Sequence, residues 1–390
     1  MISVNDAREL LFDLVAPLPA EHTPLAKSAG RVLAQDVVAT RNQPPFAASS
    51  MDGYAVKAAE VERHAMFKIV GESAAGRRFD GSVGPGQAVR IFTGAPVPEG
   101  ADFVVIQEDT ERRGDLITIT DAPGPKVNIR PTGVDFTKGT TISAPRLIRA
   151  EDVALMAAMN IPQVPVTQRP EIALISTGDE LVMPGETPGP DQIIASNTFG
   201  LQALLEDLGA RVRILPIAQD TVSSLETAFD LARGADLVVT IGGASVGDYD
   251  LVSDVSHGLG MERSFYKIRM RPGKPLMAGR LGDAAMVGLP GNPVSAMVCG
   301  YLFLAPMVRR MLGLDQVLTS FQRAKLTEPL PANGPREHYM RAILDENGIR
   351  ACPDQDSSLL SVLAEANALL VRPPQDSTQK TGDEVLYLPL

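Results

Sequence analysis

The chain has 390 residues, of which 44% are hydrophobic and 21% are charged, a composition typical of soluble globular proteins. At ~100–200 residues per domain, this length predicts two to four domains. With 47 acidic and 36 basic residues the formal net charge is −11. This charge excludes an overall basic surface for nucleic acid, although a local basic pocket for a small anion remains compatible with it.

The chain contains only two cysteines, Cys299 and Cys352, and four histidines, none at the spacings of zinc fingers, ferredoxins or haem sites. A disulfide framework is excluded, so we expect a reducing cytosol and metal ligands that are protein oxygens or sulfurs brought by a ligand. The N-terminal residues lack the pattern of a signal peptide. The longest apolar run, 296–308, is shorter than the ~20 residues that cross a bilayer. We therefore expect a cytoplasmic protein with no membrane partner.

The N-terminal segment begins with a capping box, Ser3 to Asp6, ahead of an apolar face at helical spacing, and Pro17 ends the predicted helix. From about Pro44 to Gly139, short β-rich runs lie between glycine and proline turns, at 67–70, 88–92, 103–106 and 116–120. This pattern predicts a small β-rich domain. We then expect a helix over 150–160 and an extended linker over 161–166.

From residue 170 onward, strands and helices alternate. Predicted strands cover 172–175, 212–217, 237–241, 265–268 and 286–289. One predicted helix begins near Ser196 or Asn197, and three others cover 222–232, 250–257 and 293–311. This alternation predicts a parallel sheet with helices on both faces. The last 70 or so residues return to short strands, such as 339–344 and 384–388, without helical periodicity of comparable strength.

Acidic residues and glycines follow four of these predicted strands, at the edge where doubly wound sheets bind ligands. The segments are Ser176-Thr-Gly-Asp-Glu180, the loop with Asp220, Gly242-Gly-Ala-Ser-Val-Gly-Asp-Tyr-Asp250 and Gly288-Leu-Pro-Gly-Asn-Pro293. The glycine turns lead into helix N-termini, which favour an anion, and the acids suit Mg²⁺. Neither a Walker A sequence nor a GxGxxG after a strand occurs, which disfavours ATPase and dehydrogenase functions.

Each of these features also has a structural explanation. Gly242-Gly243 alone is more often a tight turn, Asn292-Pro293 caps a helix, and single acids are usually solvated. Arg271-Pro-Gly-Lys-Pro275 either directs two cations to one oxyanion or forms an exposed hairpin, and the acidity of the chain favours the oxyanion. In the β-rich part, an Asp-Gly turn with a buried Met51 and Tyr54 and the run from Thr93 to Asp102 are equally compatible with structure and function.

Together, these motifs resemble the molybdopterin molybdenumtransferase family, which includes the bacterial MoeA proteins and the E domain of gephyrin. The matching residues are Ser50-Met-Asp-Gly-Tyr-Ala-Val56, Thr93-Gly-Ala-Pro96, Gly100-Ala-Asp102, Gln107-Glu108, Ser176-Thr-Gly-Asp-Glu-Leu181, Ser196-Asn197, Gly242 to Asp250, Pro272-Gly-Lys-Pro275 and Gly288 to Ser295. Each motif is modest alone, but their order over roughly residues 1–370 is highly specific.

The resemblance implies a multidomain α/β fold whose central three-layer domain is of the molybdopterin-binding type. It divides the chain into an elongated linker and dimerisation domain (1–43 plus 141–168), an inserted β-rich domain (44–140), the α/β domain (169–315) and a C-terminal β-barrel (316–390). Family members are homodimers whose site lies between the α/β domain of one subunit and the inserted domain of the other. Molybdopterin adenylyltransferase and molybdoenzyme maturation proteins are the further partners that this resemblance suggests.

The implied reaction is Mg²⁺-dependent: adenylyl-molybdopterin is hydrolysed, AMP is released and molybdate is ligated by the pterin dithiolene. The resemblance assigns catalytic roles to Asp52, Thr93, Asp135, Glu180, Asp220 and Asp250, of which Glu180, Asp220 and Asp250 would hold Mg²⁺ or orient the attacking group. Gly242, Gly243, Ser245 and Gly247 would cradle the nucleotide. Arg271 and Lys274 would hold molybdate and phosphate oxygens, and Pro290, Gly291, Asn292, Arg341 and Ser361 complete the substrate site.

The chain departs from the family pattern in three places. The family's Arg-Arg-x-Gly-Glu-Asp is Arg130-Pro-Thr-Gly-Val-Asp135 here, so that Pro131 and Val134 replace a base and an acid. Its Arg-Arg-Glu-Phe-x-Arg is Arg336-Glu-His-Tyr-Met-Arg341, which places His338 at the position of the glutamate. A Ser-Gly pair after Gln355 becomes Ser357-Ser358.

Three other functions remain alternatives. Molybdopterin adenylyltransferase resembles residues 170–315 alone, and the extra segments at both sides disfavour it. A non-catalytic scaffold like the gephyrin E domain is disfavoured by the intact acids Asp52, Glu180 and Asp250. A paralogue specialised for tungstate, or for another pterin nucleotide, is equally compatible with the sequence.

Overall fold

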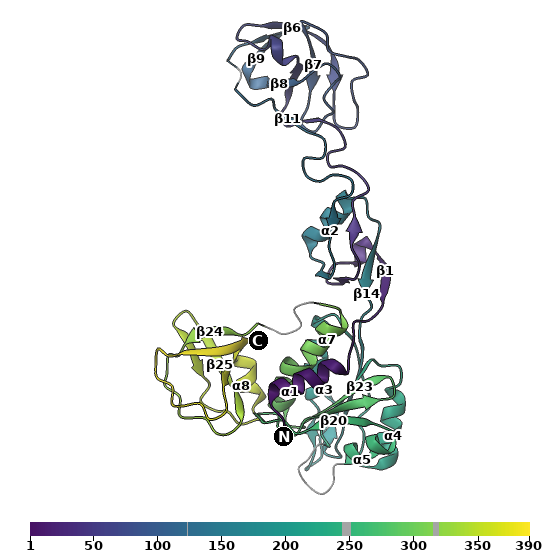
Figure 1. The fold of residues 1–390 in the computed structure, drawn as a ribbon, viewed down its shortest axis with the longest axis vertical. Coiled ribbons are helices and arrows are strands. Elements are labelled where there is room, and N and C mark those ends of the chain that lie inside the picture. The colour runs from purple at the N-terminus through teal and green to yellow at the C-terminus, as the bar shows by residue number, and fades with distance from the viewer. Residues whose placement is uncertain (123, 244–250, 315–319) are drawn as a thin grey trace.

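The computed structural model describes residues 1–122, 124–243, 251–314 and 320–390. Figure 1 shows an elongated chain with a β-rich unit at one end and an α/β unit beside a β-barrel at the other. A small unit that contains helix α2 (Ala150–Ala158) separates them. We call these four parts the distal β unit (β4 to β11), the linker unit (β1 to β3, β12 to β14 and α2), the α/β unit (β15 to β23 with α3 to α7) and the barrel (β24 to β28).

The capping box at the N-terminus is confirmed, because Ser3 Oγ accepts from Asp6 N and Asp6 Oδ2 accepts from Ser3 N, both at 3.1 Å. Helix α1 (Val4–Asp13) follows it. Its buried face joins the hydrophobic core of the α/β unit, and Figure 1 shows α1 lying beside α7 (Ala305–Met311). The first helix of the chain therefore packs on the α/β unit, whereas the strands that come after it enter the linker unit.

The linker unit is built on a four-stranded sheet in the order β1-β14-β2-β13. The extended linker predicted over 161–166 is wrong, since β14 (Gln163–Thr167) pairs with β1 (Ala20–Pro24) and β2 (Val32–Leu33) and buries Val164 and Val166 completely. Two prolines obscured a strand whose valines alternate at period 2. The other paired segments are β13 (Arg146–Leu147), β3 (Val37–Val38) and β12 (Thr141–Ile142).

The distal β unit contains a six-stranded sheet in the order β8-β5-β7-β6-β10-β9. Its strands are β5 (Gly53–Val56), β6 (Met66–Ser73), β7 (Gln87–Ile91), β8 (Phe103–Ile106), β9 (Thr110–Arg113) and β10 (Leu116–Ile119), beside the pair β4 (Ala48–Ser49) and β11 (Ile129–Arg130). The four predicted runs are confirmed. Strand β5 was not predicted, although it lies between β7 and β8, and a Cβ at Gly53 would lie 1.9 Å from the carbonyl oxygen of Val105. Tyr54 is buried as expected, but Met51 is 40% exposed.

The sheet of the α/β unit has the order β18-β15-β19-β23-β22-β20. The predicted parallel arrangement is confirmed for β18 (Arg211–Ile214), β15 (Glu171–Ser176), β19 (Leu237–Ile241) and β23 (Ala284–Leu289). It is wrong at one edge, where β22 (Met277–Leu281) and β20 (Glu262–Tyr266) run antiparallel. Both faces are covered, by α3 (Asn197–Asp207) with α6 and α7 on one face and by α4 (Val222–Leu231) with α5 (Leu251–Gly258) on the other.

The helix predicted over 293–311 is confirmed, with a change of geometry in its middle. Helix α6 (Pro293–Cys299) passes through a π-turn at Gly300–Leu304 into α7. Pro306 has no N–H to bond the Leu302 carbonyl, which instead accepts from Arg8 Nε at 3.4 Å. By length and composition this helix is apolar enough to cross a membrane, but 78% of its most apolar window is buried inside the protein.

The barrel is formed by β24 (Gln322–Lys325), β25 (Glu337–Asp345), β26 (Gly348–Ala351), β27 (Ala368–Arg372) and β28 (Glu384–Pro389). The sheet closes where Leu326 bridges Ile349 and Thr327 N donates to the Ile349 carbonyl at 3.0 Å. A short helix that was not predicted, α8 (Leu360–Glu365), lies against it. Strand β21 (Met270–Arg271) pairs in parallel with β25 and so joins the α/β unit to the barrel.

Candidate active site

A cavity of about 650 Å³ lies at the carboxyl ends of β15, β19 and β23. Its lining includes residues of the four segments predicted at the strand ends, the segment 193–197, Pro275 and one loop of the barrel. The lining residues are Ser176, Thr177, Gly178, Glu180, Leu181, Ile193, Ile194, Ala195, Ser196, Asn197, Asp220, Ile241, Gly242, Gly243, Pro275, Pro290, Gly291, Asn292, Pro293 and Ser358. The cavity thus contains seven of the predicted site residues, namely Glu180, Asp220, Gly242, Gly243, Pro290, Gly291 and Asn292.

The glycine pair after β19 is required by close packing. Gly242 has φ +97° and a Cβ there would lie 2.6 Å from the carbonyl oxygen of Thr177, while Gly243 has φ +67° and a Cβ would lie 2.4 Å from Val252 Cγ2. Any larger residue would strain the backbone and push into the floor of the cavity. The rest of this loop, including the predicted residues Ser245, Gly247 and Asp250, lies outside the described residues.

Thr177 supplies a buried hydroxyl to this floor. The residue is 3% exposed, lines the cavity, and its Oγ1 has no hydrogen-bond partner within the described part of the chain. A buried hydroxyl without a partner costs ~1–3 kcal/mol. We did not single out Thr177 from the sequence. Its place between a buried strand and Gly178 could have indicated that it lies at the strand end where the cavity forms.

Carboxylates gather at one side of the cavity. Asp179 Oδ1 accepts from Asp220 N at 3.1 Å, and Glu180 and Asp220 both line the cavity. Burial and the negative charges of Asp179 and Glu180 raise the pKa of Asp220. These oxygens are the hard donors that Mg²⁺ prefers. Within the described ranges no three carboxylate, histidine or cysteine side chains are close enough to hold a metal, and Asp250, the third predicted ligand, lies outside those ranges.

The turn that opens α6 connects the cavity to the barrel. Asn292 occupies the N-cap position, but its side chain does not cap the helix: Nδ2 donates to Ser357 Oγ at 3.2 Å. Val294 N donates to the Ser357 carbonyl at 3.0 Å, and Asn197 Nδ2 donates to the Gly291 carbonyl at 2.7 Å. Capping alone therefore does not explain Asn292, which instead ties the barrel loop to the edge of the cavity.

Arg341 holds this barrel loop in place through hydrogen bonds to its backbone. Only 2% exposed, it donates to the carbonyls of Asp356 at 2.7 Å and Asp354 at 3.2 Å. The loop brings Ser358 to the cavity, a contact that we did not predict. Arg341 does not line the cavity in this structure and acts as a positioning residue, while Ser361 is exposed on α8 and also lies outside the lining.

Arg271 and Lys274 lie on the loop that precedes the cavity-lining Pro275. Gly273 between them has φ +102°, and a Cβ there would lie 2.6 Å from Cys299 Sγ, so the loop packs tightly on α6. Arg271 is in register with His338 on β25, which places Arg271 at the junction with the barrel. The exposed-hairpin explanation does not account for this pairing.

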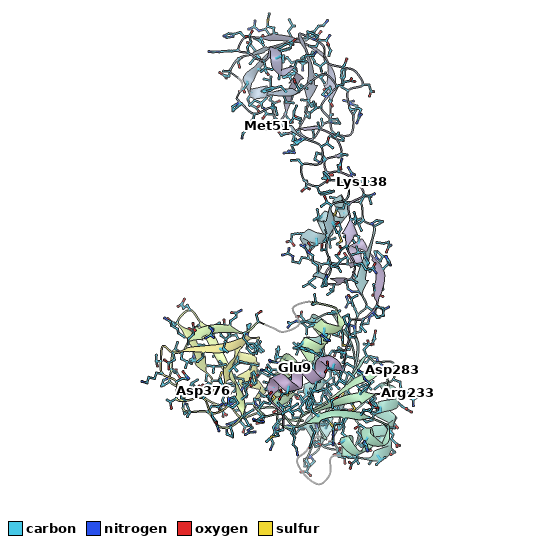
Figure 2. The ribbon with its side chains drawn as sticks, in the orientation of Figure 1. Glu9, Met51, Lys138, Arg233, Asp283 and Asp376 are labelled. Carbon is cyan, nitrogen blue, oxygen red and sulfur yellow. The ribbon has the colours of Figure 1, made fainter. Side chains whose placement is uncertain are left out.

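Of the remaining three predicted residues, Asp52 and Thr93 belong to the distal β unit, and Asp135 lies between β11 and β12, next to Phe136 of the core of the linker unit. Asp52 Oδ1 accepts from Thr93 N at 2.7 Å and from Thr93 Oγ1 at 2.9 Å. These bonds lower the pKa of Asp52, so its carboxylate stays ionised. Figure 2 shows Met51, the neighbour of Asp52, in the distal β unit, far from Arg233 and Asp283 of the α/β unit. A single chain therefore does not bring these residues to the cavity.

Family models match nearly the whole chain in consecutive parts. The MoeA N-terminal region (domain I and II) matches residues 2–160, the probable molybdopterin binding domain matches 173–310, and the MoeA C-terminal region (domain IV) matches 323–390.

Curated relatives and solved structures agree with these matches. The molybdopterin molybdenumtransferase of Nostoc sp. is 35% identical, covering 100% of this chain and 94% of its own length. That of Haemophilus influenzae is 33% identical, with 100% and 98% coverage. Two crystal structures of the molybdopterin biosynthesis MoeA protein of Pyrococcus horikoshii match with TM-scores of 0.88 and 0.84 at 28% and 26% identity, covering 100% of this chain and 99% and 100% of theirs.

Replacing Arg341 by methionine should loosen the 354–359 loop, because several buried hydrogen bonds, each worth ~0.5–1.5 kcal/mol, are lost together. We expect faster amide hydrogen exchange in this loop and at least a tenfold loss of turnover. Arg350→Met is the matched control, since Arg350 pairs with Asp345 at the barrel surface. Lost turnover with unchanged exchange in the loop would instead indicate that Arg341 contacts the substrate directly.

Proposed function

The chain belongs to the MoeA family of molybdopterin molybdenumtransferases, and on this premise we propose that its cavity binds adenylyl-molybdopterin and inserts molybdate, releasing AMP. The observation that carries the proposal is the floor of the cavity. There, the Gly242-Gly243 turn and the acids Glu180 and Asp220 come together at the carboxyl ends of parallel strands, in a cavity of about 650 Å³. The family models extend on both sides of the molybdopterin-binding part, which disfavours a single-domain adenylyltransferase.

The nucleotide part of the substrate would lie over the Gly242-Gly243 turn, which lines the cavity. Hydrolysis at its phosphate requires positioning and charge neutralisation more than a covalent nucleophile. Backbone N–H groups exposed at glycine turns supply both without a side chain. Ser245 and Gly247, which follow in the sequence, are the further residues that we propose for this cradle.

Mg²⁺ is the cation that we propose for the acidic side of the cavity, held by Glu180 and Asp220 with Asp250. When bound, it would neutralise phosphate charge. The same charge would relieve the repulsion that raises the pKa of Asp220, because Asp179 and Glu180 oppose ionisation of that carboxyl in the free protein.

Molybdate and phosphate oxygens would be held by Arg271 and Lys274. The protein offers no sulfur ligand there: Cys299 and Cys352 are both buried, and burial raises the pKa of the Cys299 thiol. The two sulfurs that ligate molybdenum would therefore come from the dithiolene of the substrate.

We also propose a cytoplasmic homodimer in which the distal β unit of one chain completes the cavity of the other. Exposed apolar side chains support this, because Met51 (40% exposed) and Val134 (58%) flank the distal acids. At the cavity, Ile193 (59%) and Ile194 (38%) are similarly exposed. Association would cover these side chains and bring Asp52, Thr93 and Asp135 to the substrate. Molybdopterin adenylyltransferase and molybdoenzyme maturation proteins are the further partners we propose.

The direct test incubates the purified protein with adenylyl-molybdopterin, Mg²⁺ and molybdate. We expect AMP release and a product that activates an apo-molybdoenzyme. Absence of AMP release would refute the proposed reaction. Competition between molybdate and tungstate in the same assay tests for a tungstate-specific paralogue.

Complementation between two inactive variants tests the shared site. Asp52→Ala and Glu180→Ala homodimers should each be folded and inactive. A heterodimer, purified through two different affinity tags, should recover about half of the activity, since one of its two sites contains both native residues. If the heterodimer is as inactive as its parents, the site does not combine these residues across subunits.

Titration with Mg²⁺ tests the role of Asp220. Asp220→Asn should raise the Mg²⁺ concentration for half-maximal AMP release at least tenfold. In the wild type, the Mg²⁺ concentration required should rise as pH falls. The raised pKa means that Asp220 is protonated at a higher pH than an ordinary aspartate, and the bound proton competes with Mg²⁺. Asp230→Asn, which alters an exposed acid paired with Arg233 away from the cavity, should change neither quantity. A wild-type requirement independent of pH would contradict this assignment.

A further inference from the structure

The junction between the α/β unit and the barrel contains a row of basic side chains. Arg271 on β21 is in register with His338 on β25, and His338 is in register with Arg372 on β27. Residues directly opposite one another on neighbouring strands project from the same face of the sheet. The imidazole of His338 therefore lies between two guanidinium groups, one from the α/β unit and one from the barrel.

His338 is uncharged in this row. It is 8% exposed, and burial together with Arg271, Arg336, Arg372 and Arg341 lowers its pKa to about 4. Among the residues that the structure describes, only positive charges act on the imidazole, and the nearby carboxylate of Glu337 accepts from the Tyr339 hydroxyl. At neutral pH the row thus carries two positive charges and one neutral, polar spacer.

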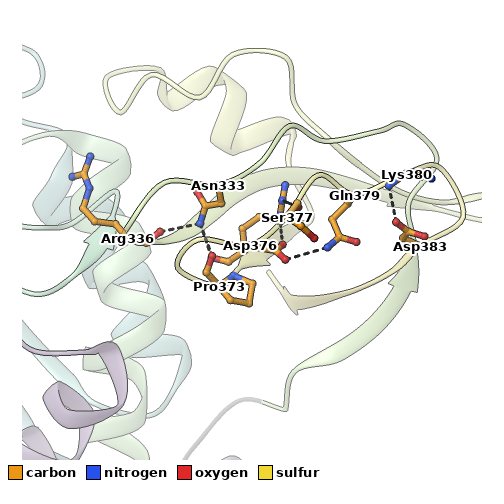
Figure 3. A network of polar contacts seen from close by, with 9 residues as sticks. Asn333, Arg336, Pro373, Asp376, Ser377, Gln379, Lys380 and Asp383 are labelled. Carbon is orange, nitrogen blue, oxygen red and sulfur yellow. Dashed lines mark hydrogen bonds and ion pairs between the residues drawn. The ribbon is translucent and has the colours of Figure 1, made fainter.

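The arginines around His338 differ in how their charges are satisfied. Arg372 donates to the carboxylate of Asp376 and to the Ser377 carbonyl, in the network of Figure 3. Arg341 donates to loop carbonyls. Figure 3 shows the side chain of Arg336 directed away from the network.

Two of the arginines that act on His338, Arg271 and Arg336, have no such partner, and neither has Lys274, which follows Arg271 by three residues. Among the described residues, the side chains of Arg271, Lys274 and Arg336 have no hydrogen-bond or ion-pair partner, in a chain whose net charge is −11. Arg271 is exposed on the loop that leads to the cavity-lining Pro275, so its unpaired guanidinium is accessible to a tetrahedral dianion, which such cations bind.

We propose that His338 is a specificity-determining positioning residue, whose uncharged imidazole keeps Arg271 free to bind the tetrahedral oxyanion. This inference rests on the proposed function, because it concerns the molybdate that Arg271 and Lys274 would hold. A carboxylate in the same register would face Arg271 across the strand pair, form an ion pair with it and compete with the incoming dianion. His338 does not line the cavity, so its effect is exerted through Arg271.

The register explains why a histidine suits this place. An alkyl side chain would leave the two guanidinium groups without a polar group between them, and a lysine would add a third positive charge to the row. A neutral imidazole adds no charge and can both donate and accept a hydrogen bond. It therefore separates the free Arg271 from the paired Arg372 without neutralising either.

The test measures binding of molybdate to the full-length protein by equilibrium dialysis. His338→Glu should raise the Kd at least fivefold, whereas the uncharged His338→Gln should stay within twofold of the wild type. High salt should reduce the difference, since it screens the new carboxylate. His257→Glu is the matched control, because it makes the same change of charge at an exposed position of α5 and should leave the Kd unchanged.

Coupling to Arg271 separates positioning from general damage. In an Arg271→Gln background, His338→Glu should have no further effect on molybdate binding. In AMP release, His338→Glu should raise the KM for molybdate and leave kcat at saturating molybdate within twofold. Equal losses in His338→Glu and His338→Gln, or a Kd in His338→Glu equal to that of the wild type, would overturn the inference.

A measurement on the native protein does not depend on the folding of a variant. In histidine-labelled wild type at neutral pH, with the signal of His338 assigned by its loss in His338→Gln, molybdate should shift the imidazole nitrogen signals of His338. The reason is that Arg271, which would bind the dianion, is in register with His338. Unchanged signals at saturating molybdate would also overturn the inference. Molybdate binding without AMP release would instead refute the proposed reaction and leave the role of His338 intact.

Discussion

The close approach of the β19 loop to the segment after β15 is the constraint on which the candidate site depends. Gly242 and Gly243 pass so near Thr177 that a Cβ at either position would overlap it or Val252. Parallel strands place these segments side by side, as the bond from Thr177 N to the Ile241 carbonyl at 3.0 Å shows. The floor of the cavity is therefore made of backbone and one hydroxyl, and the charged groups stand around it.

A second set of contacts connects this floor to the barrel. Strand β21 pairs with β25, Asn292 bonds Ser357, and side chains of β25, β27 and β28 share the hydrophobic core of the α/β unit. The barrel is thus held by apolar burial as well as by polar contacts. Because Arg341 fixes the loop that carries Ser358, the barrel supplies part of the cavity wall, which gives this C-terminal part a structural reason to accompany the α/β unit.

Local patterns predicted the α/β unit well, because period-2 alternation divides its strands between two covered faces. Ile172 and Leu174 enter one core cluster, while Ala173 and Ile175 enter the other. The motifs at the strand ends predicted the acids and glycines that line the cavity. These patterns are local in the chain, and they required only the rule that parallel strands end at one edge.

Features that depend on distant contacts were not predictable in this way. Strand β14 contains a proline and becomes a strand only by pairing with β1 and β2. Gly53 begins a central strand because Val105 approaches it, not because it turns the chain. Ser358 and His338 acquire their places from loop and strand pairings between the barrel and the α/β unit. The hydrophobic periodicity of a segment does not show which of its side chains contact another unit, so the roles of such side chains could not be predicted.

The distribution of charge unites these observations. Acids that would repel one another in a single pocket are divided between two places: Glu180 and Asp220 lie at the cavity, and Asp52 is held ionised by Thr93 in the distal β unit. The free cations lie at a third place, beside the barrel. Burial and the neighbouring acids already raise the pKa of Asp220, so a further acid in the same pocket would oppose its ionisation more strongly. In the shared site that we propose, an oxyanion would offset the charge of the arginines and a divalent cation would offset the charge of the acids.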